Sequence, residues 1–241
     1  MEDIEKYYKY IANVNEYSRE SEISKKRLKE FEKIYEDNKD FFGHRILDLC
    51  CGGGIFSIFL AEKGHKVLGI DINKNMIDLA NKYKPNQDNP VFIQGDVTKF
   101  KPDKDFDTII CMGGSLMHIP FKGFVDITKN IFQKTNKVLI ESFDRIAYGF
   151  EGKLKYVMVQ KRPEKGISFD FYDKYDPDEG AMLKTCLYIG EDGRIETFDF
   201  KVYLYGPFVV EALMYSAGFE LKKRLKPEHG VYIDFYEKTS I

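Results

Sequence analysis

The stretch RILDLCCGGGIFS, at residues 45–57, decides the fold. RILDL is a short apolar run of the kind that forms a buried strand, and the glycines Gly52–Gly54 follow it after Cys50 and Cys51. A helix is expected from Ile55 to Lys63, with Gly64 as its C-cap. A strand, a glycine-rich turn and a helix in this order are typical of nucleotide-cofactor sites. The amides at the helix start point at the ligand, and glycine permits its close approach.

The rest of the sequence alternates between apolar strands and amphipathic helices. Further strands are expected at residues 65–71, 91–96, 107–112, 137–143, 219–225 and 231–237. Helices are expected at 74–83, with Asn73 as N-cap, near 124–132, and at 207–215. Near-continuous apolar strands between helices indicate a parallel sheet that is covered on both faces. The last two strands are expected to form a hairpin that returns to the sheet edge.

Two segments differ from this pattern. Residues 1–40 are expected to form an N-terminal cap of one or two amphipathic helices over the core, with a break near Asn13–Glu16. Residues 153–205 alternate apolar and polar side chains between turn sequences, which predicts an antiparallel β meander inserted into the α/β domain. We therefore expect residues 1–241 to form a single domain of the α/β class.

Composition limits the possible functions. The chain has 37 Lys and Arg against 39 Asp and Glu, a formal net charge of −2, which argues against binding a nucleic-acid backbone. No apolar run approaches the ~20 residues that span a bilayer, and the N-terminus lacks the pattern of a signal peptide. We therefore expect a cytoplasmic protein with no membrane partner. The four cysteines follow neither a disulfide nor a zinc spacing, so no metal is expected.

Three acidic residues lie at the ends of the first three strands: Asp48, Asp71 and Asp96. Asp71 follows Gly54 by 17 residues, near the ~20-residue spacing of a carboxylate that binds ribose hydroxyls. This suits a dinucleotide or S-adenosylmethionine. A dinucleotide turn has a third glycine where Ser57 stands. The carboxylate of Asp48 would repel a pyrophosphate and attract an ammonium and a sulfonium, so both details favour S-adenosylmethionine over a nicotinamide cofactor.

With these residues in place, the sequence resembles the class I S-adenosylmethionine-dependent methyltransferases. The resemblance rests on RILDLCCGGGIFS, VLGIDINKNMIDLA, FIQGDV and FDTIICMGGSLMHI, in that order, and covers about residues 40–145 firmly. It implies a Rossmann-like seven-stranded sheet, with helices on both faces and an antiparallel last strand. The inserted meander and the N-terminal helices are added to that sheet. One departure is that Cys50 stands where the family usually has glycine.

The resemblance also implies roles for individual residues. The cofactor-binding residues that it implies are Asp48, Cys50, Gly52, Gly54, Asp71, Ile72, Met76, Asp96, Val97 and Met112. In such a site Asp71 holds both ribose hydroxyls, Asp96 reads the adenine edge, and Cys50 lies at the methionine end. A basic residue meets the methionine carboxylate in relatives, and Arg27 or Lys26 is a candidate, although a solvated helix face is the simpler interpretation.

The acceptor side resembles small-molecule N-methyltransferases. The segment ICMGGSLMHI, at residues 110–119, is similar to glycine, sarcosine and amino-sugar N-methyltransferases. This similarity implies two catalytic candidates, His118 near the cofactor and substrate and Tyr205 in the active-site wall. Each also has a purely structural interpretation, His118 as a core or capping histidine and Tyr205 as sheet surface. Phe143 stands where the glycine enzymes carry arginine, which argues against glycine itself as the acceptor.

We therefore expect an enzyme that methylates a small molecule with S-adenosylmethionine, at an amine nitrogen or an oxygen. Attack on a sulfonium methyl depends mainly on positioning and a dry pocket. Where a proton must be removed, His118, Glu141 or a tyrosine hydroxyl is a candidate base. The alternatives are an RNA or protein methyltransferase, which would need a basic rim on its pocket, and a non-catalytic S-adenosylmethionine-binding module. The sequence does not predict an oligomeric state.

Overall fold

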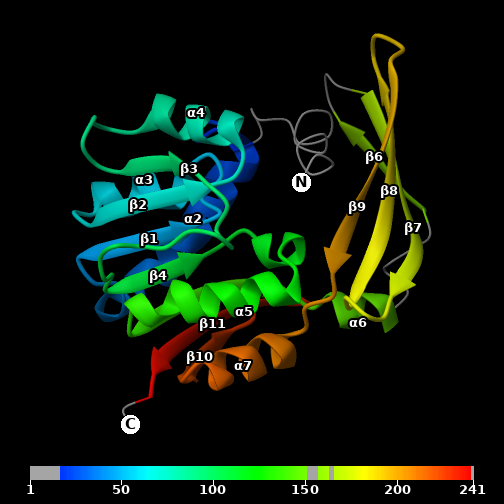
Figure 1. Ribbon diagram of the computed structural model, residues 1–241. Coiled ribbons are helices and arrows are strands. Elements are labelled where there is room, and N and C mark those ends of the chain that lie inside the picture. The colour runs from blue at the N-terminus through cyan, green and yellow to red at the C-terminus, as the bar shows by residue number, and fades with distance from the viewer. Residues whose placement is uncertain (1–16, 151–156, 163–165, 240–241) are drawn as a thin grey trace.

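The computed structural model describes residues 17–150, 157–162 and 166–239. The chain forms two sheets (Figure 1). One has seven strands and is covered by helices, and the other is a separate sheet of four strands. The part of the predicted N-terminal cap before residue 17 lies outside the described residues. Its remainder is helix α2, Glu22–Glu36, whose first turn is capped by the Ser21 hydroxyl. None of the described helices has the length and apolar character needed to cross a membrane.

The larger sheet has the strand order β10-β11-β5-β4-β1-β2-β3. Its strands are β1 Arg45–Leu49, β2 Lys66–Asp71, β3 Val91–Gln94, β4 Thr108–Cys111, β5 Lys137–Phe143, β10 Phe219–Leu225 and β11 Val231–Lys238. β1 to β5 pair in parallel, whereas β11 runs antiparallel to both β5 and β10. The expected α/β class and the antiparallel last strand are confirmed. The final hairpin extends the sheet with its second strand inside, against β5, and its first strand at the edge.

Helices cover both faces of this sheet, α2, α3 and α4 on one and α5 and α7 on the other (Figure 1). Their bounds are α3 Ile55–Glu62, α4 Lys74–Tyr83, α5 Phe121–Asn130 and α7 Pro207–Ser216. α4 begins where the sequence predicted, because the Asn73 side chain accepts hydrogen bonds from the amides of Asn75 and Met76. α5 begins three residues earlier than predicted, directly after Pro120.

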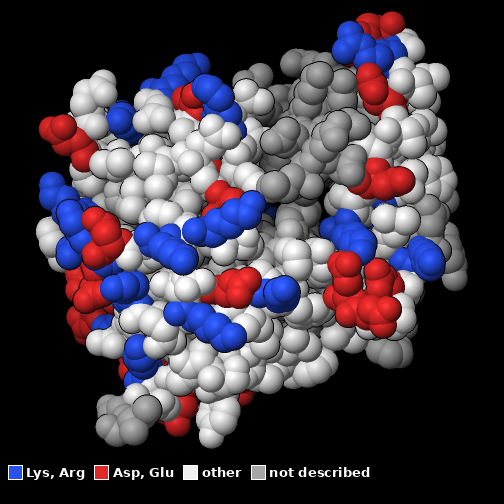
Figure 2. Space-filling view, in the orientation of Figure 1, with Lys and Arg blue, Asp and Glu red and all other residues white. Residues whose placement is uncertain are grey.

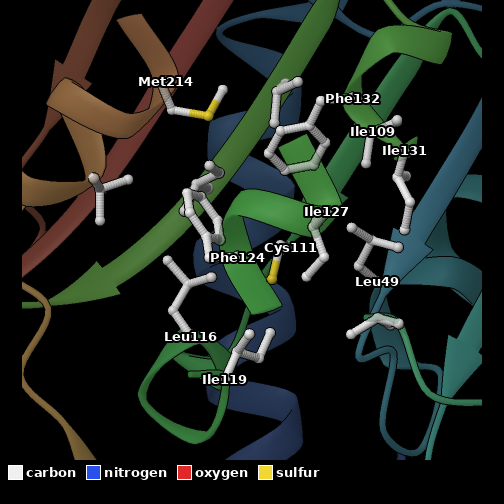
Figure 3. Packing of buried hydrophobic residues seen from close by; sticks show 14 of the residues in the cluster. Leu49, Ile109, Cys111, Leu116, Ile119, Phe124, Ile127, Ile131, Phe132 and Met214 are labelled. Carbon is white, nitrogen blue, oxygen red and sulfur yellow. The ribbon is translucent and has the colours of Figure 1, made fainter. Parts of the chain in front are cut away.

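Apolar side chains fill the space between α5, α7 and the sheet (Figure 3). Phe124 and Ile127 of α5 pack with Leu49 of β1 and Cys111 of β4, and all four are almost completely buried. The Phe124 and Phe132 rings meet edge to face, with centroids 6.0 Å apart. This packing fixes the carboxyl ends of β1 and β4, from which the candidate site begins.

The inserted segment forms its own antiparallel sheet, in the order β6-β7-β8-β9, as its alternation predicted. Its strands are β6 Val157–Arg162, β7 Gly166–Asp176, β8 Ala181–Gly190 and β9 Ile195–Tyr203, and the short helix α6, Arg145–Phe150, precedes them. The turn between β7 and β8 touches α5: a Cβ atom on Gly180 would lie 2.7 Å from the Phe121 ring. The carboxyl ends of β1 to β4 point toward this sheet (Figure 1).

We expect Phe124→Ala to lower the free energy of unfolding by about 3–5 kcal/mol, because the side chain is fully buried and its removal leaves a cavity. The matched control is Phe208→Ala on α7, where the ring is 63% exposed, and it should change stability by less than about 0.5 kcal/mol. Urea unfolding of the two variants measures the difference. Equal losses would show that the core is not where the structure places it.

Candidate active site

A cavity of about 970 Å³ lies between the carboxyl ends of the parallel strands and the four-stranded sheet. Cavities of this size hold small ligands and cofactors. One half, here called the cofactor half, is lined by the turn after β1, the end of β2 and residues 95–98. The other, the acceptor half, is lined by residues 199–201 and 203 of β9. Residues 117–120, 122 and 123 also reach the cavity. Two ligands can therefore meet within one cavity.

The turn after β1 adopts a left-handed backbone at Cys50, Gly52 and Gly54, with φ of 57°, 53° and 75°. A Cβ atom on Gly54 would lie 2.6 Å from the Phe92 ring, so this glycine allows α3 to pack close to β3. A Cβ atom on Gly52 would meet nothing within 4 Å. Gly52 therefore leaves space toward the cavity, and a ligand can approach the turn there.

Cys50 lines the cavity in a conformation that favours glycine, consistent with the family's glycine at this position. A hydrogen bond with Cys111, together with burial, raises the pKa of the Cys50 thiol. The thiol therefore stays protonated at neutral pH, where it is a poor nucleophile. The geometry assigns Cys50 to the wall rather than to the chemistry.

Asp71 ends β2 and anchors the turn after β1. Its Oδ2 accepts a hydrogen bond from the Gly52 amide at 2.9 Å, and its Oδ1 accepts one from the Asn73 amide at 2.9 Å. Burial raises the pKa of Asp71, although the same amides oppose this shift. The carboxylate also lines the cavity. Each of its oxygens can accept a second hydrogen bond there, which suits a pair of hydroxyl donors.

The expected adenine-binding residues come together beside Asp71. Ile72, Met76 and Val97 line the cavity and present apolar surface. Asp96 also lines it, but its Oδ1 already accepts hydrogen bonds from the Thr98 amide and hydroxyl, at 2.9 and 2.7 Å. Partial burial opposes ionisation of Asp96, yet these bonds and Lys99 outweigh it and hold the pKa below its usual value. Asp96 is therefore ionised at neutral pH and is a hydrogen-bond acceptor only.

Two expected cofactor residues do not line the cavity. Asp48 is 1% exposed and lies in β1, where its Oδ2 accepts a hydrogen bond from the Ser57 hydroxyl at 2.6 Å. Burial raises its pKa to about 7, despite the opposing hydrogen bond, and the charge of Asp71 adds to the shift. Asp48 therefore fastens β1 to α3 behind the site. Gly54 is the N-cap of α3 and is buried in the packing described above.

An ion pair joins three segments at the cofactor half. Arg27 of α2 donates a hydrogen bond from Nη2 to Oε2 of Glu141 at 2.6 Å. The same oxygen accepts a hydrogen bond from the Gly113 amide at 3.0 Å. Arg27 lines the cavity with Ile23 and Ser24, so it does not belong to a solvated helix face. Glu141 is engaged in this pair and does not line the cavity, which argues against its expected use as a base.

His118 lies on the short 3-10 helix after β4, Ser115–His118, and lines the cavity. Burial, with the charges of Lys184 and Arg145, lowers its pKa to about 4. The imidazole is therefore neutral at physiological pH and is a weak base. Its ring centroid lies 6.1 Å from that of Phe200, a cavity residue of β9, so the histidine belongs to the acceptor half.

Tyr205 does not form the expected active-site wall. Its side chain is 1% exposed, and its hydroxyl donates a hydrogen bond to the carbonyl oxygen of Ile119 at 3.1 Å. Its ring packs against Phe121, with centroids 4.4 Å apart, inside the core. The cavity instead contains Tyr203, whose hydroxyl donates a hydrogen bond to Glu179. The role that the resemblance implied for Tyr205 does not fit this structure, because the chain leaves β9 after Tyr203 and residue 205 turns into the core.

The structure also brings residues to the cavity that sequence reasoning missed. Lys122 and Asp126 come from the first two turns of α5, and Asp199 and Lys201 come from β9. Pro120 could have indicated Lys122 and Asp126, because proline is favoured at helix starts. It would have placed the start of α5 three residues earlier than predicted. Asp199 and Lys201 alternate with their neighbours in β9 and share a face with Tyr203. They could therefore have been found once Tyr203 was placed in the cavity wall.

The residues of the cofactor half fit S-adenosylmethionine. The space at Gly52, the carboxylate of Asp71 and the apolar surface of Ile72 and Met76 provide for backbone approach, a ribose and an adenine ring. Arg27 supplies a cation for the carboxylate of an amino acid. These partners come from the chain's own geometry and match the chemistry of each part of the cofactor.

Comparisons with known proteins agree with this geometry. A family model described as a methyltransferase domain matches residues 46–137. The chain is 34% identical over 102 residues to the putative methyltransferase YqeM of Bacillus subtilis, covering 42% of this chain and 41% of that protein. It is 36% identical over 89 residues to glycine N-methyltransferase of Mus musculus, covering 32% of this chain and 30% of that protein. The matched part is thus less than half the length of these relatives.

A solved structure matches over nearly the whole chain. The PH0226 protein from Pyrococcus horikoshii OT3 aligns with a TM-score of 0.72 at 23% identity, and the alignment covers 97% of this chain and 99% of that one. At this identity the similarity shows the fold. Its coverage means that the shared architecture extends beyond the matched domain.

We expect Asp48→Asn to remove a pH-dependent loss of stability. A raised carboxyl pKa means that the native state keeps its proton between about pH 4 and 7, while the unfolded chain has lost it. Stability is therefore lost as the pH rises through that window. Asparagine keeps an oxygen for the Ser57 hydroxyl and does not ionise, so the variant should gain a few kcal/mol at pH 8 relative to wild type and little at pH 4.

Urea unfolding at the two pH values, without ligand, measures this difference. The control is Asp88→Asn at an exposed position, which should leave the pH dependence unchanged. A wild-type stability that does not fall between pH 4 and 7 relative to Asp48→Asn would contradict the assignment.

Proposed function

Because the chain belongs to the class I S-adenosylmethionine-dependent methyltransferases, by its methyltransferase domain and its fold, we propose that it methylates a small molecule, at an amine nitrogen. The observation that carries this proposal is the shared cavity. Asp71 and the open turn at Gly52 face one half of it, and Phe200 and Tyr203 of the inserted sheet face the other. A donor and an acceptor can thus be held next to each other in one cavity.

When bound, S-adenosylmethionine supplies an electrophilic methyl group. The chain's own contribution is to bind and orient, because a single in-line displacement gains most from proximity and a dry pocket. Asp71 and the turn after β1 fix the cofactor's ribose. His118 stays neutral, so it adds no positive charge that would repel a sulfonium. It can accept a hydrogen bond from an acceptor N–H and thereby turn the nitrogen lone pair, which makes positioning its proposed role.

The charges of the acceptor half support an amine. Asp199 lines it and Asp126 lines the same cavity, and Lys201, which also lines the acceptor half, is held by Asp176 and Glu179 at 3.1 and 2.8 Å. The ammonium of Lys201 is therefore neutralised within the wall. Carboxylates in the cavity lining attract an ammonium-bearing molecule before it loses its proton and reacts. The mouse relative named above is itself called a glycine N-methyltransferase.

An RNA or protein methyltransferase is the main alternative, and it would require a basic rim. On the face shown in Figure 2, acidic and basic side chains of the described residues are interspersed rather than gathered into a basic area. Both signs also occur among the cavity residues, as with Lys122 and Asp126. This supports a small molecule. The cytoplasmic location stays a prediction.

We expect Asp71→Ala to weaken S-adenosylmethionine binding by about 2–4 kcal/mol, because it removes two charge-assisted hydrogen bonds to ribose hydroxyls. Isothermal titration calorimetry measures the change. The control is Asp78→Ala, an exposed carboxylate of α4 paired with Lys74, which should bind as wild type does. Unchanged affinity in Asp71→Ala would refute the binding mode.

Turnover separates an enzyme from a binding module. Incubation of the protein with methyl-labelled S-adenosylmethionine and a set of small amines should give labelled product and S-adenosylhomocysteine in stoichiometric amounts. Amines should be methylated in preference to matched alcohols and carboxylic acids. Tight cofactor binding without methyl transfer to any class of acceptor would leave only the binding function.

A further inference from the structure

We propose that Glu141 is a positioning residue of the cofactor site: it holds Arg27 in place so that the guanidinium meets the carboxylate of S-adenosylmethionine. This rests on the proposed function and extends it to a residue outside the cavity wall. Glu141 lies in β5, is 3% exposed and does not line the cavity. It therefore acts through the groups that it binds.

One oxygen of Glu141 holds two distant segments together. Oε2 accepts a hydrogen bond from Arg27, 114 residues away in sequence, and one from the amide of Gly113, in the loop after β4. Arg27 belongs to α2, and the loop leads directly to Ser115 and His118, which line the cavity. The carboxylate thus fixes the N-terminal helix and the loop that carries His118 relative to each other.

Arg27 is also held from a second direction. Its guanidinium lies over the Phe56 ring of α3, 5.7 Å from the ring centroid. A guanidinium has five N–H donors in one plane, and the bond to Glu141 restricts its position while using only part of the donor set. Because Arg27 lines the cavity, the remaining donors are available to a carboxylate, which guanidinium binds with paired hydrogen bonds.

Charge complementarity places that carboxylate at the cofactor half. Among the described residues that line the cavity, Arg27 is the cation nearest in the fold to the turn after β1, since Lys122 lies on α5 and Lys201 on β9. With the ribose held at Asp71, the amino-acid part of the cofactor must extend along the same turn. A free arginine would lose rotamer freedom on binding, and Glu141 restricts that freedom beforehand.

The energetics explain why a buried carboxylate is kept in the middle of a sheet. A carboxylate this deeply buried is costly unless it is paired and hydrogen-bonded, and replacing such a pair by apolar groups often leaves a protein at least as stable. Glu141 is paired with an arginine whose side chain is 31% exposed and lines the cavity. The arrangement is therefore better suited to orienting Arg27 than to stabilising the fold.

The test compares two ligands that differ in the amino-acid part. S-adenosylhomocysteine carries the carboxylate, and 5′-methylthioadenosine lacks it. Glu141→Gln keeps an oxygen for the Gly113 amide and removes the charge that orients Arg27. We expect it to weaken S-adenosylhomocysteine binding roughly 10-fold to 100-fold and to leave 5′-methylthioadenosine binding within about twofold, by calorimetry. The matched control is Glu211→Gln on α7. It removes a carboxylate that pairs with Arg224 of β10 and should change the affinity for neither ligand.

A second variant keeps the proposal testable if Glu141→Gln does not fold, as judged by thermal melting. Arg27→Met, on a partly exposed helix position, should show the same selective loss. In the double variant, the affinity for S-adenosylhomocysteine should be less than about twofold weaker than in Arg27→Met alone, because Glu141 acts through Arg27.

Three results would overturn the proposal. Equal losses for the two ligands would mean that Glu141 only supports the fold. If Glu141→Gln weakened S-adenosylhomocysteine binding as much in the Arg27→Met variant as in wild type, Glu141 would touch the ligand directly. An Arg27→Met variant that binds S-adenosylhomocysteine as wild type does would remove the assigned contact. A wild-type protein that binds neither ligand would instead refute the proposed function.

Discussion

The hydrogen bond from the Gly52 amide to the Asp71 carboxylate is the constraint on which the rest of the site depends. It joins the turn after β1 to the end of β2 and so fixes the opening of α3 relative to the neighbouring strand. The Cys51 amide adds a backbone bond to the carbonyl oxygen of Ile70 at 3.0 Å, and the two bonds together hold the left-handed turn against β2. The same carboxylate caps the start of the next segment through Asn73, so one side chain organises both segments that the ligand meets.

The acceptor half depends on a different constraint, the docking of the inserted sheet on α5. Gly180 packs against Phe121 where no side chain would fit, and Glu179 of the same turn binds Tyr203 and Lys201. This turn thereby holds β9, which lines the acceptor half together with His118. Because β9 lies outside the matched residues 46–137, we expect substitutions there to change acceptor binding and to leave cofactor binding unaffected.

Local pattern predicted the elements whose ends are set by local hydrogen bonds. β1 and α4 match their predicted bounds, because an apolar run and the Asn73 cap are encoded in adjacent residues. The site was only partly predictable. Arg27 reaches Glu141 across 114 residues, and no helical period indicates such a partner. Tyr205 was placed in the wall by resemblance alone, which did not indicate that β9 ends at Tyr203. Asp48 was expected in the cavity, but burial against Ser57 draws it behind the wall.

Hydrogen–deuterium exchange with and without S-adenosylhomocysteine tests the central claim most directly. The account predicts slower exchange in bound protein for three regions that are distant in sequence: the turn at residues 50–55, the end of β2 at 71–73, and the loop at 113–118. The hairpin of β10 and β11, on the far side of the sheet, should exchange as before. Protection confined to that hairpin or to the four-stranded sheet, or none at saturating ligand, would contradict the placement of the cofactor at the carboxyl ends of β1 and β2.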